Sequence, residues 1–117
     1  AYPKLLLPGF VDAHCHLPQY GATGRQAPDL LSWLDEHIYP AEAAFADPLL
    51  ARTASERFFH ALAANGTTTA CVFTAPFAEA TAIAFQAAEA SGLRVTMGLN
   101  LMDGGAPVAL CSPTEGA

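Results

Sequence analysis

The sequence predicts an α/β fold with parallel strands, and two observations lead to this expectation. Extended apolar segments alternate with helical ones along the 117 residues, in the order strand, helical segment, strand, helix, strand. Residues 67–73 are β-branched or apolar throughout, which is typical of a strand covered on both faces. Such alternation indicates parallel strands joined by right-handed crossovers, although three strands fit a barrel and an open sheet equally well.

The first strand is expected over residues 10–16, directly after the turn signal Pro8-Gly9. A loop rich in Gly, Pro and Gln follows over residues 17–27. In barrels and open parallel sheets alike, sites gather at the carboxyl ends of the strands. The end of this strand and the loop after it are therefore the first place to look for chemistry.

The segments that join the first strand to the second are expected to be helical. One runs from Pro28-Asp29 to Pro40, and its apolar stripe comprises Leu30, Leu31, Leu34 and Ile38. Residues 41–45 are expected to add a short helical turn. A longer helix begins at Asp47-Pro48, a good cap followed by a good first residue, and stops at Asn65-Gly66.

The second half of the chain completes the alternation. The strand 67–73 is followed by an alanine-rich helix over residues 76–90, which Gly92 closes. A third strand is expected over residues 94–102. The stretch 103–117, with its Gly, Pro and small polar residues, is expected to be a loop.

Composition and charge argue against two classes of partner. A net charge of −6 with five Lys and Arg disfavours nucleic acid, and no apolar stretch approaches the roughly 20 residues that span a membrane. With 52% apolar and 14% charged residues, much of the surface is expected to be covered, and we expect a homo-oligomer. Three widely spaced cysteines, Cys15, Cys71 and Cys111, indicate a reducing compartment, and the cytoplasm is expected.

Two histidines stand at the carboxyl end of the first expected strand. Side chains alternate along a strand, so His14 and His16 are expected to point to one side and Cys15 to the other. Two imidazoles at this spacing can converge on one metal ion, whereas the alternative is a pair of surface histidines at a strand end. Asp12 has the same parity and is expected to orient an imidazole from behind.

The residues around this pair carry a family resemblance. The stretch 7–16, Leu-Pro-Gly-Phe-Val-Asp-Ala-His-Cys-His, resembles the opening strand of the amidohydrolase superfamily, whose pattern is PGxxDxHxH. The resemblance covers about residues 7–103 and is strongest to the guanine deaminase branch. That narrower match rests on Pro18-Gln19-Tyr20, Trp33-Leu34, Tyr39-Pro40-Ala41-Glu42 and Asn65-Gly66-Thr67-Thr68-Thr69-Ala70-Cys71.

The resemblance implies a fold, a cofactor and an activity. Residues 1–117 would be the N-terminal fragment of a TIM-type (β/α)₈ barrel domain, with its first three strands and no complete second domain. His14 and His16 would bind Zn²⁺, and Gln19 would hydrogen-bond the edge of a purine, with Asp12 behind the ligands. The reaction would be hydrolytic deamination of guanine to xanthine and ammonia. The other ligands and the proton-shuttling glutamate come from later strands in the family, so this fragment would hold no catalytic residue and would be inactive alone.

Two alternatives remain open from the sequence. The chain could belong to another aminohydrolase or chlorohydrolase of the superfamily, acting on a triazine, cytosine or an adenosine derivative, or it could be a non-catalytic remnant of the fold. His37 and His60 are expected to be solvated helix positions and Trp33 to pack, while Arg25 lies in the loop where it could meet substrate. Glu42 matches the family motif, and the sequence assigns it no task.

Overall fold

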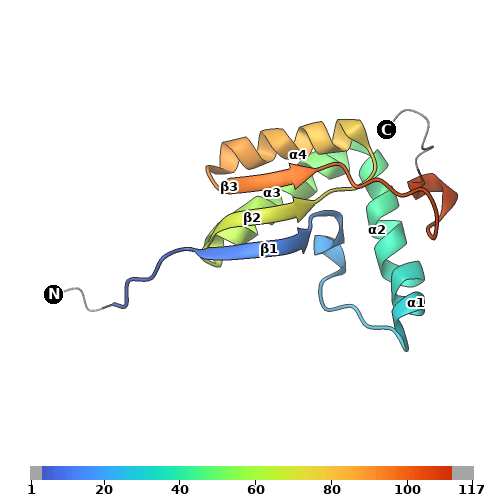
Figure 1. Cartoon of the computed structure of the whole chain (residues 1–117), viewed down its shortest axis with the longest axis horizontal. Coiled ribbons are helices and arrows are strands. Elements are labelled where there is room, and N and C mark those ends of the chain that lie inside the picture. The colour runs from blue at the N-terminus through green and yellow to red at the C-terminus, as the bar shows by residue number, and fades with distance from the viewer. Residues whose placement is uncertain (1–3, 112–117) are drawn as a thin grey trace.

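The computed structural model describes residues 4–111 and contains a parallel sheet in the strand order β1–β2–β3 (Figure 1). The strands are β1 (Phe10–His16), β2 (Thr67–Phe73) and β3 (Arg94–Gly98). The long helices α3 (Pro48–Ala64) and α4 (Ala78–Ser91) pack side by side and cover one face of the sheet. The strand order and the parallel pairing agree with the sequence prediction.

The core lies between these helices and one face of β2. Ala70 and Val72 are each 2% exposed and belong to the same apolar cluster as buried residues of both helices. Cys71 and Phe73 alternate with them and are only partly buried. The cover that the sequence predicted on the second face is not provided by residues 4–111. In a closed barrel, side chains from the other strands pack against that face.

Several short helices form the long connection between β1 and β2. In chain order they are η1 (Pro18–Ala22), α1 (Leu30–Trp33), η2 (Leu34–Ile38), α2 (Tyr39–Ala43) and η3 (Ala44–Ala46). From α1 to η3 they form one continuous rod that stands beside the carboxyl ends of the strands (Figure 1). This rod and the loop before it therefore border the end of the sheet where chemistry was expected.

The predicted end of a helix at Pro40 is wrong, because the rod continues through it. Proline lacks an amide hydrogen, and in a regular α-helix its ring clashes with the carbonyl four residues earlier. The turn before it, η2, is π-helical, and the amide of Tyr39 donates to the carbonyl of Leu34. This wider turn admits the proline as an early residue of α2.

The predicted caps are present, whereas the third strand is shorter than expected. Asp29 and Asp47 accept hydrogen bonds from backbone amides of the helices they precede, at 2.9 Å each. Strand β3 ends at Gly98, not at residue 102, because Gly98 pairs with Phe73 and β2 ends there. The expected loop beyond contains the short helix η4 (Val108–Leu110), and its residues 112–117 lie outside the described part of the chain.

A glycine governs how the chain enters β1. A Cβ atom at Gly9 would overlap the side chain of Thr68 on the neighbouring strand β2. The Pro-Gly pair before the first strand therefore does more than mark a turn, because only glycine permits this close approach of the two strands.

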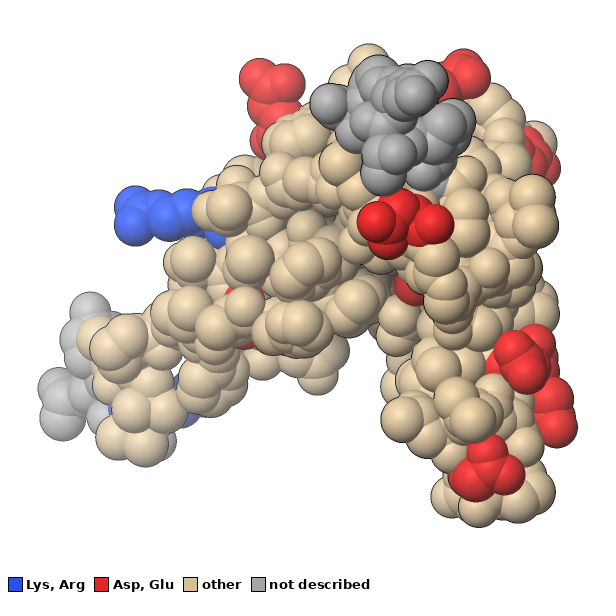
Figure 2. Space-filling view, turned by 45° about the vertical axis from the view of Figure 1, so that its right-hand side comes forward, with Lys and Arg blue, Asp and Glu red and all other residues tan. Residues whose placement is uncertain are grey.

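The surface of the described chain is mainly uncharged. Figure 2 shows few basic side chains on the face it presents. Most of the acidic ones lie toward the right of the view, where the rod from α1 to η3 stands. Several large apolar side chains are well exposed, among them Leu30, Leu31 and Leu49. No helix within residues 4–111 is long and apolar enough to cross a bilayer.

Candidate metal centre and substrate cavity

His14 and His16 converge at the carboxyl end of β1. Their Nε2 atoms lie 3.1 Å apart, and the ring of Phe73 from β2 contacts both imidazoles. The Phe73 ring lies nearly parallel to that of His16, at a centroid distance of 5.0 Å, and 4.7 Å from that of His14. The sequence predicted that the two histidines would meet, but it gave no role to Phe73, which comes from another strand.

Strand β1 does not alternate regularly. A bulge between Asp12 and Cys15 adds a residue to β1, so Asp12 pairs with the buried Ala70 while His16 pairs with Phe73 on the open face. The Asp12 carboxylate accepts a hydrogen bond from the backbone amide of His14, at 3.1 Å. The parity expected for Asp12 is therefore lost, and its carboxylate holds the backbone of a histidine instead of an imidazole.

The surroundings of His16 favour the neutral imidazole. Burial lowers its pKa below the ordinary value, the positive form of His14 lowers it further, and Glu42 partly opposes both effects. A neutral imidazole is the form that binds a metal ion. Its Nδ1 atom is buried and has no hydrogen-bond partner within residues 4–111.

Cys15 behaves as an inert thiol. Burial, followed by the negative charge of Asp12, raises its pKa to about 11. The thiol donates to the backbone carbonyl of Cys71 and contacts the core, as expected for a side chain on the helix side of the sheet. It is therefore a poor nucleophile and a poor metal ligand near neutral pH.

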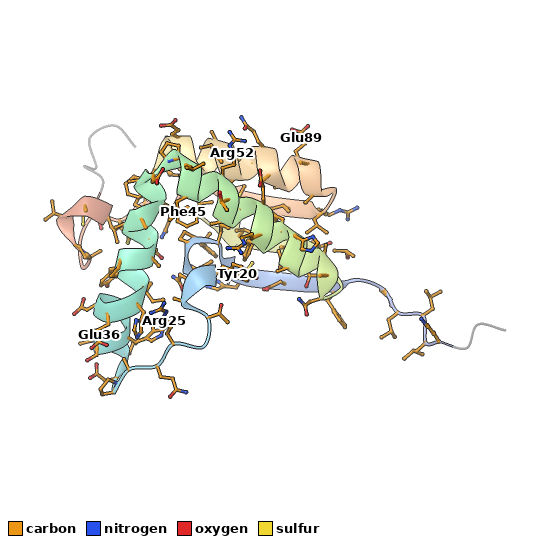
Figure 3. The ribbon with its side chains drawn as sticks, turned by 180° about the vertical axis from the view of Figure 1, so that it is seen from behind. Tyr20, Arg25, Glu36, Phe45, Arg52 and Glu89 are labelled. Carbon is orange, nitrogen blue, oxygen red and sulfur yellow. The ribbon has the colours of Figure 1, made fainter. Side chains whose placement is uncertain are left out.

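A cavity of about 350 Å³ opens beside the two histidines. It is bordered by His14, His16, Gln19, Tyr20, Arg25, Trp33 and Phe58, among others. The loop after β1 lines it, as the sequence predicted. Figure 3 shows Tyr20 and Arg25 on this loop, between β1 and the helical rod.

Side chains of the rod fasten this loop. Trp33 Nε1 donates to the carbonyl of Arg25 at 3.1 Å, and His37 Nε2 lies 3.2 Å from the carbonyl oxygen of Gln26. Tyr20 packs edge-on against Phe58 of α3, with ring centroids 5.8 Å apart. His37 is therefore not simply a solvated position, and Trp33 holds the wall of the cavity in addition to packing.

Gln19 reaches back from the cavity to the rod. Its Nε2 atom donates to Oε1 of Glu42 at 2.8 Å, and Glu42 is 4% exposed. The sequence assigned no task to Glu42, although its place in the family-like motif was a signal. By contrast, His60 is exposed on α3 and borders a separate hollow with Glu56 and Phe59.

A larger hollow, of about 690 Å³, lies between η1, the rod and α3. Arg25, His37 and Arg57 border it, but neither His14 nor His16 does. Within residues 4–111, no group of three or more His, Cys, Asp or Glu side chains could hold a metal ion. The chemistry of the described chain is therefore concentrated at the two histidines and the smaller cavity.

Comparison with known proteins agrees with this picture. The model of the amidohydrolase family matches residues 5–110. A probable guanine deaminase of Deinococcus radiodurans is 48% identical over 99 residues, which are 85% of this chain and 23% of that protein. The chain spans about a quarter of the length of the guanine deaminases that it matches.

Two solved structures resemble the fold. The guanine deaminase of Bradyrhizobium japonicum superposes with a TM-score of 0.87 at 41% identity, covering 92% of this chain and 23% of that one. The guanine deaminase of C. acetobutylicum, solved with guanine bound in the active site, gives 0.85 at 31% identity, covering 90% and 25%. This likeness confirms the predicted fold, the first strands and helices of a TIM-type barrel.

Proposed function

Because the chain belongs to the amidohydrolase family, we propose that it forms the metal-binding opening of an enzyme that hydrolyses guanine to xanthine and ammonia. One observation carries the proposal: two histidines meet with Nε2 atoms 3.1 Å apart, beside a cavity that a carboxamide also borders. The similarity to guanine deaminases supports the choice of substrate. The remaining machinery would come from the other three quarters of such an enzyme.

The two histidines fit a zinc ion. With Zn–N bonds of roughly 2.0–2.1 Å, a separation of 3.1 Å corresponds to an N–Zn–N angle of about 98°, near the tetrahedral value. Both nitrogens belong to imidazoles that contact the Phe73 ring at the end of β1, and burial favours the neutral form of His16. Catalytic zinc takes three protein ligands and a water, so at least one further ligand would come from outside this chain.

The side chains of this chain would bind and orient the purine. His14 and His16 would hold a zinc ion whose chemistry would be to supply hydroxide at neutral pH, because zinc lowers the pKa of its bound water to about 7. Gln19 would hydrogen-bond the purine edge, and Tyr20 and Trp33 would hold the loop that excludes bulk water. The amino group would leave as ammonia after water adds to its ring carbon, and the carboxylate that moves the protons would come from the rest of such an enzyme.

We place the protein in the cytoplasm and expect self-association. Cys15, Cys71 and Cys111 are free thiols, as is typical of a reducing compartment. Exposed apolar side chains such as Leu30 and Leu49 support contact with further protein, either the rest of the enzyme or a second copy.

The experiment is an ammonia-release assay with guanine on the full-length protein that carries this chain. We expect turnover that a chelator abolishes and that added zinc restores. His14→Ala and His16→Ala should each lower kcat/KM by about a thousandfold or more. His60→Ala, at an exposed position on α3, should leave it unchanged. Full activity of either ligand variant would refute the proposed metal site.

A further inference from the structure

Within residues 4–111, Glu42 on α2 is the one charged residue that is buried, with 4% of its surface exposed. Burial of an ionised carboxylate is costly unless the group is paired and hydrogen-bonded. Within residues 4–111 its hydrogen-bond partner is the neutral carboxamide of Gln19. The rod therefore carries a costly side chain that hydrogen-bonds Gln19 of the cavity wall and whose charge also acts on His16.

The direction of this hydrogen bond follows from the chemistry of the two groups. An ionised carboxylate only accepts, whereas a carboxamide has one acceptor oxygen and two N–H donors. The Nε2 side of Gln19 must therefore face Glu42, because the flipped amide would set two oxygens against each other. Gln19 keeps Oε1 and the second N–H of Nε2 without partners within the described residues, and it borders the cavity of the two histidines.

We propose that Glu42 is a positioning residue, which fixes the order of donor and acceptor that Gln19 presents to the substrate. The inference rests on the proposed function, in which Gln19 binds a purine. The lactam of guanine offers an N–H beside a carbonyl, so the N–H donates to Oε1 while the carbonyl accepts from Nε2. A flipped carboxamide exchanges the two and makes both contacts repulsive. Glu42 thus controls substrate affinity through Gln19 and takes no part in the chemical step.

The test is a double-mutant cycle on KM and kcat for guanine, in the metal-loaded full-length protein. Glu42→Gln keeps the shape but accepts either orientation of Gln19, and KM should rise about twofold when half of the molecules are flipped. Glu42→Leu leaves the amide unheld, and KM should rise about tenfold with kcat nearly unchanged. Glu36→Gln, at an exposed position in the preceding turn η2, is the matched control and should change neither constant.

The same substitution is then made in a Gln19→Ala background. There Glu42→Leu should change KM by less than about twofold, because the group through which it acts is gone. Bound zinc, measured for every variant, should stay at the value of the corresponding Glu42 protein, and the melting temperature should show that every variant is folded at the assay temperature. An equal rise in KM in both backgrounds, or loss of zinc with Glu42→Leu, would overturn the inference. Turnover by the wild type without this coupling overturns only the role of Glu42, whereas a wild type inactive on guanine overturns the proposed function as well.

Discussion

Phe73 offers the sharpest test of how the two candidate ligands are held. Its ring contacts those of both His14 and His16, at 4.7 and 5.0 Å between centroids. Phe73→Ala removes this support and frees both imidazoles. Ordering one side chain costs about 0.5–1.5 kcal/mol, so metal binding would have to supply about 1–3 kcal/mol for the two rings. At about 1.4 kcal/mol per tenfold, zinc affinity should fall about five- to 150-fold.

The assay is competition for zinc with a chromophoric chelator, using the full-length protein. Phe85→Ala is the matched control, because Phe85 is 48% exposed on α4, away from the histidines. The control should bind zinc as the wild type does. An unchanged affinity in a folded Phe73→Ala protein would refute the reasoning, since other contacts would then hold the rings. An equal loss in the control would point to general destabilisation instead.

Three further predictions concern a buried hydroxyl, a buried thiol and the chain made alone. Thr74 Oγ1 is buried and lies 2.8 Å from both the Thr81 hydroxyl and the Gly98 carbonyl oxygen. Thr74→Val should therefore lower the free energy of unfolding by about 2–4 kcal/mol in denaturant titrations. A loss below about 1 kcal/mol would contradict this prediction. Because its pKa is raised from 9.0 to about 11, Cys15 holds about a hundredfold less thiolate at pH 8 than an ordinary cysteine does. Iodoacetamide should therefore alkylate it about a hundredfold more slowly, and Asp12→Asn should speed the reaction. The 117-residue chain made alone should neither release ammonia from guanine nor hold zinc tightly, and zinc-dependent turnover by it would show that copies assemble a complete site.

Much of the fold could be predicted because local chemistry and long-range order agree. A few neighbouring residues are enough to specify each local feature. These features are the helix caps at Asp29 and Asp47, the ends of helices at Gly66 and Gly92, and the apolar strand 67–73. Because strands and helices alternate along the chain, the strands are expected to pair in parallel. The meeting of the two histidines was likewise predictable, because it depends on a strand end and a spacing of two residues.

The features that escaped prediction depend on partners distant in the chain. The end of β3 is set by the length of β2, and the bulge in β1 removes Asp12 from the face on which simple alternation placed it. Phe73 reaches the histidines only because β2 pairs with β1 in one particular register. No pattern within a single strand contains that information.

The departure from local rules at Pro40 shows why the rod matters for the site. A helix that ended at Pro40 would leave Glu42 in a separate short helical turn, from which its side chain could turn to water, as a lone carboxylate normally does. The π-helical turn before the proline lets the helix continue, and the following turn buries Glu42 against Gln19. Local rules are most often broken where function requires it, and π-helical turns are frequent at functional sites. The connection between β1 and β2 thus places, beside the pair of histidines, an amide whose direction Glu42 fixes, which the strand alone could not provide.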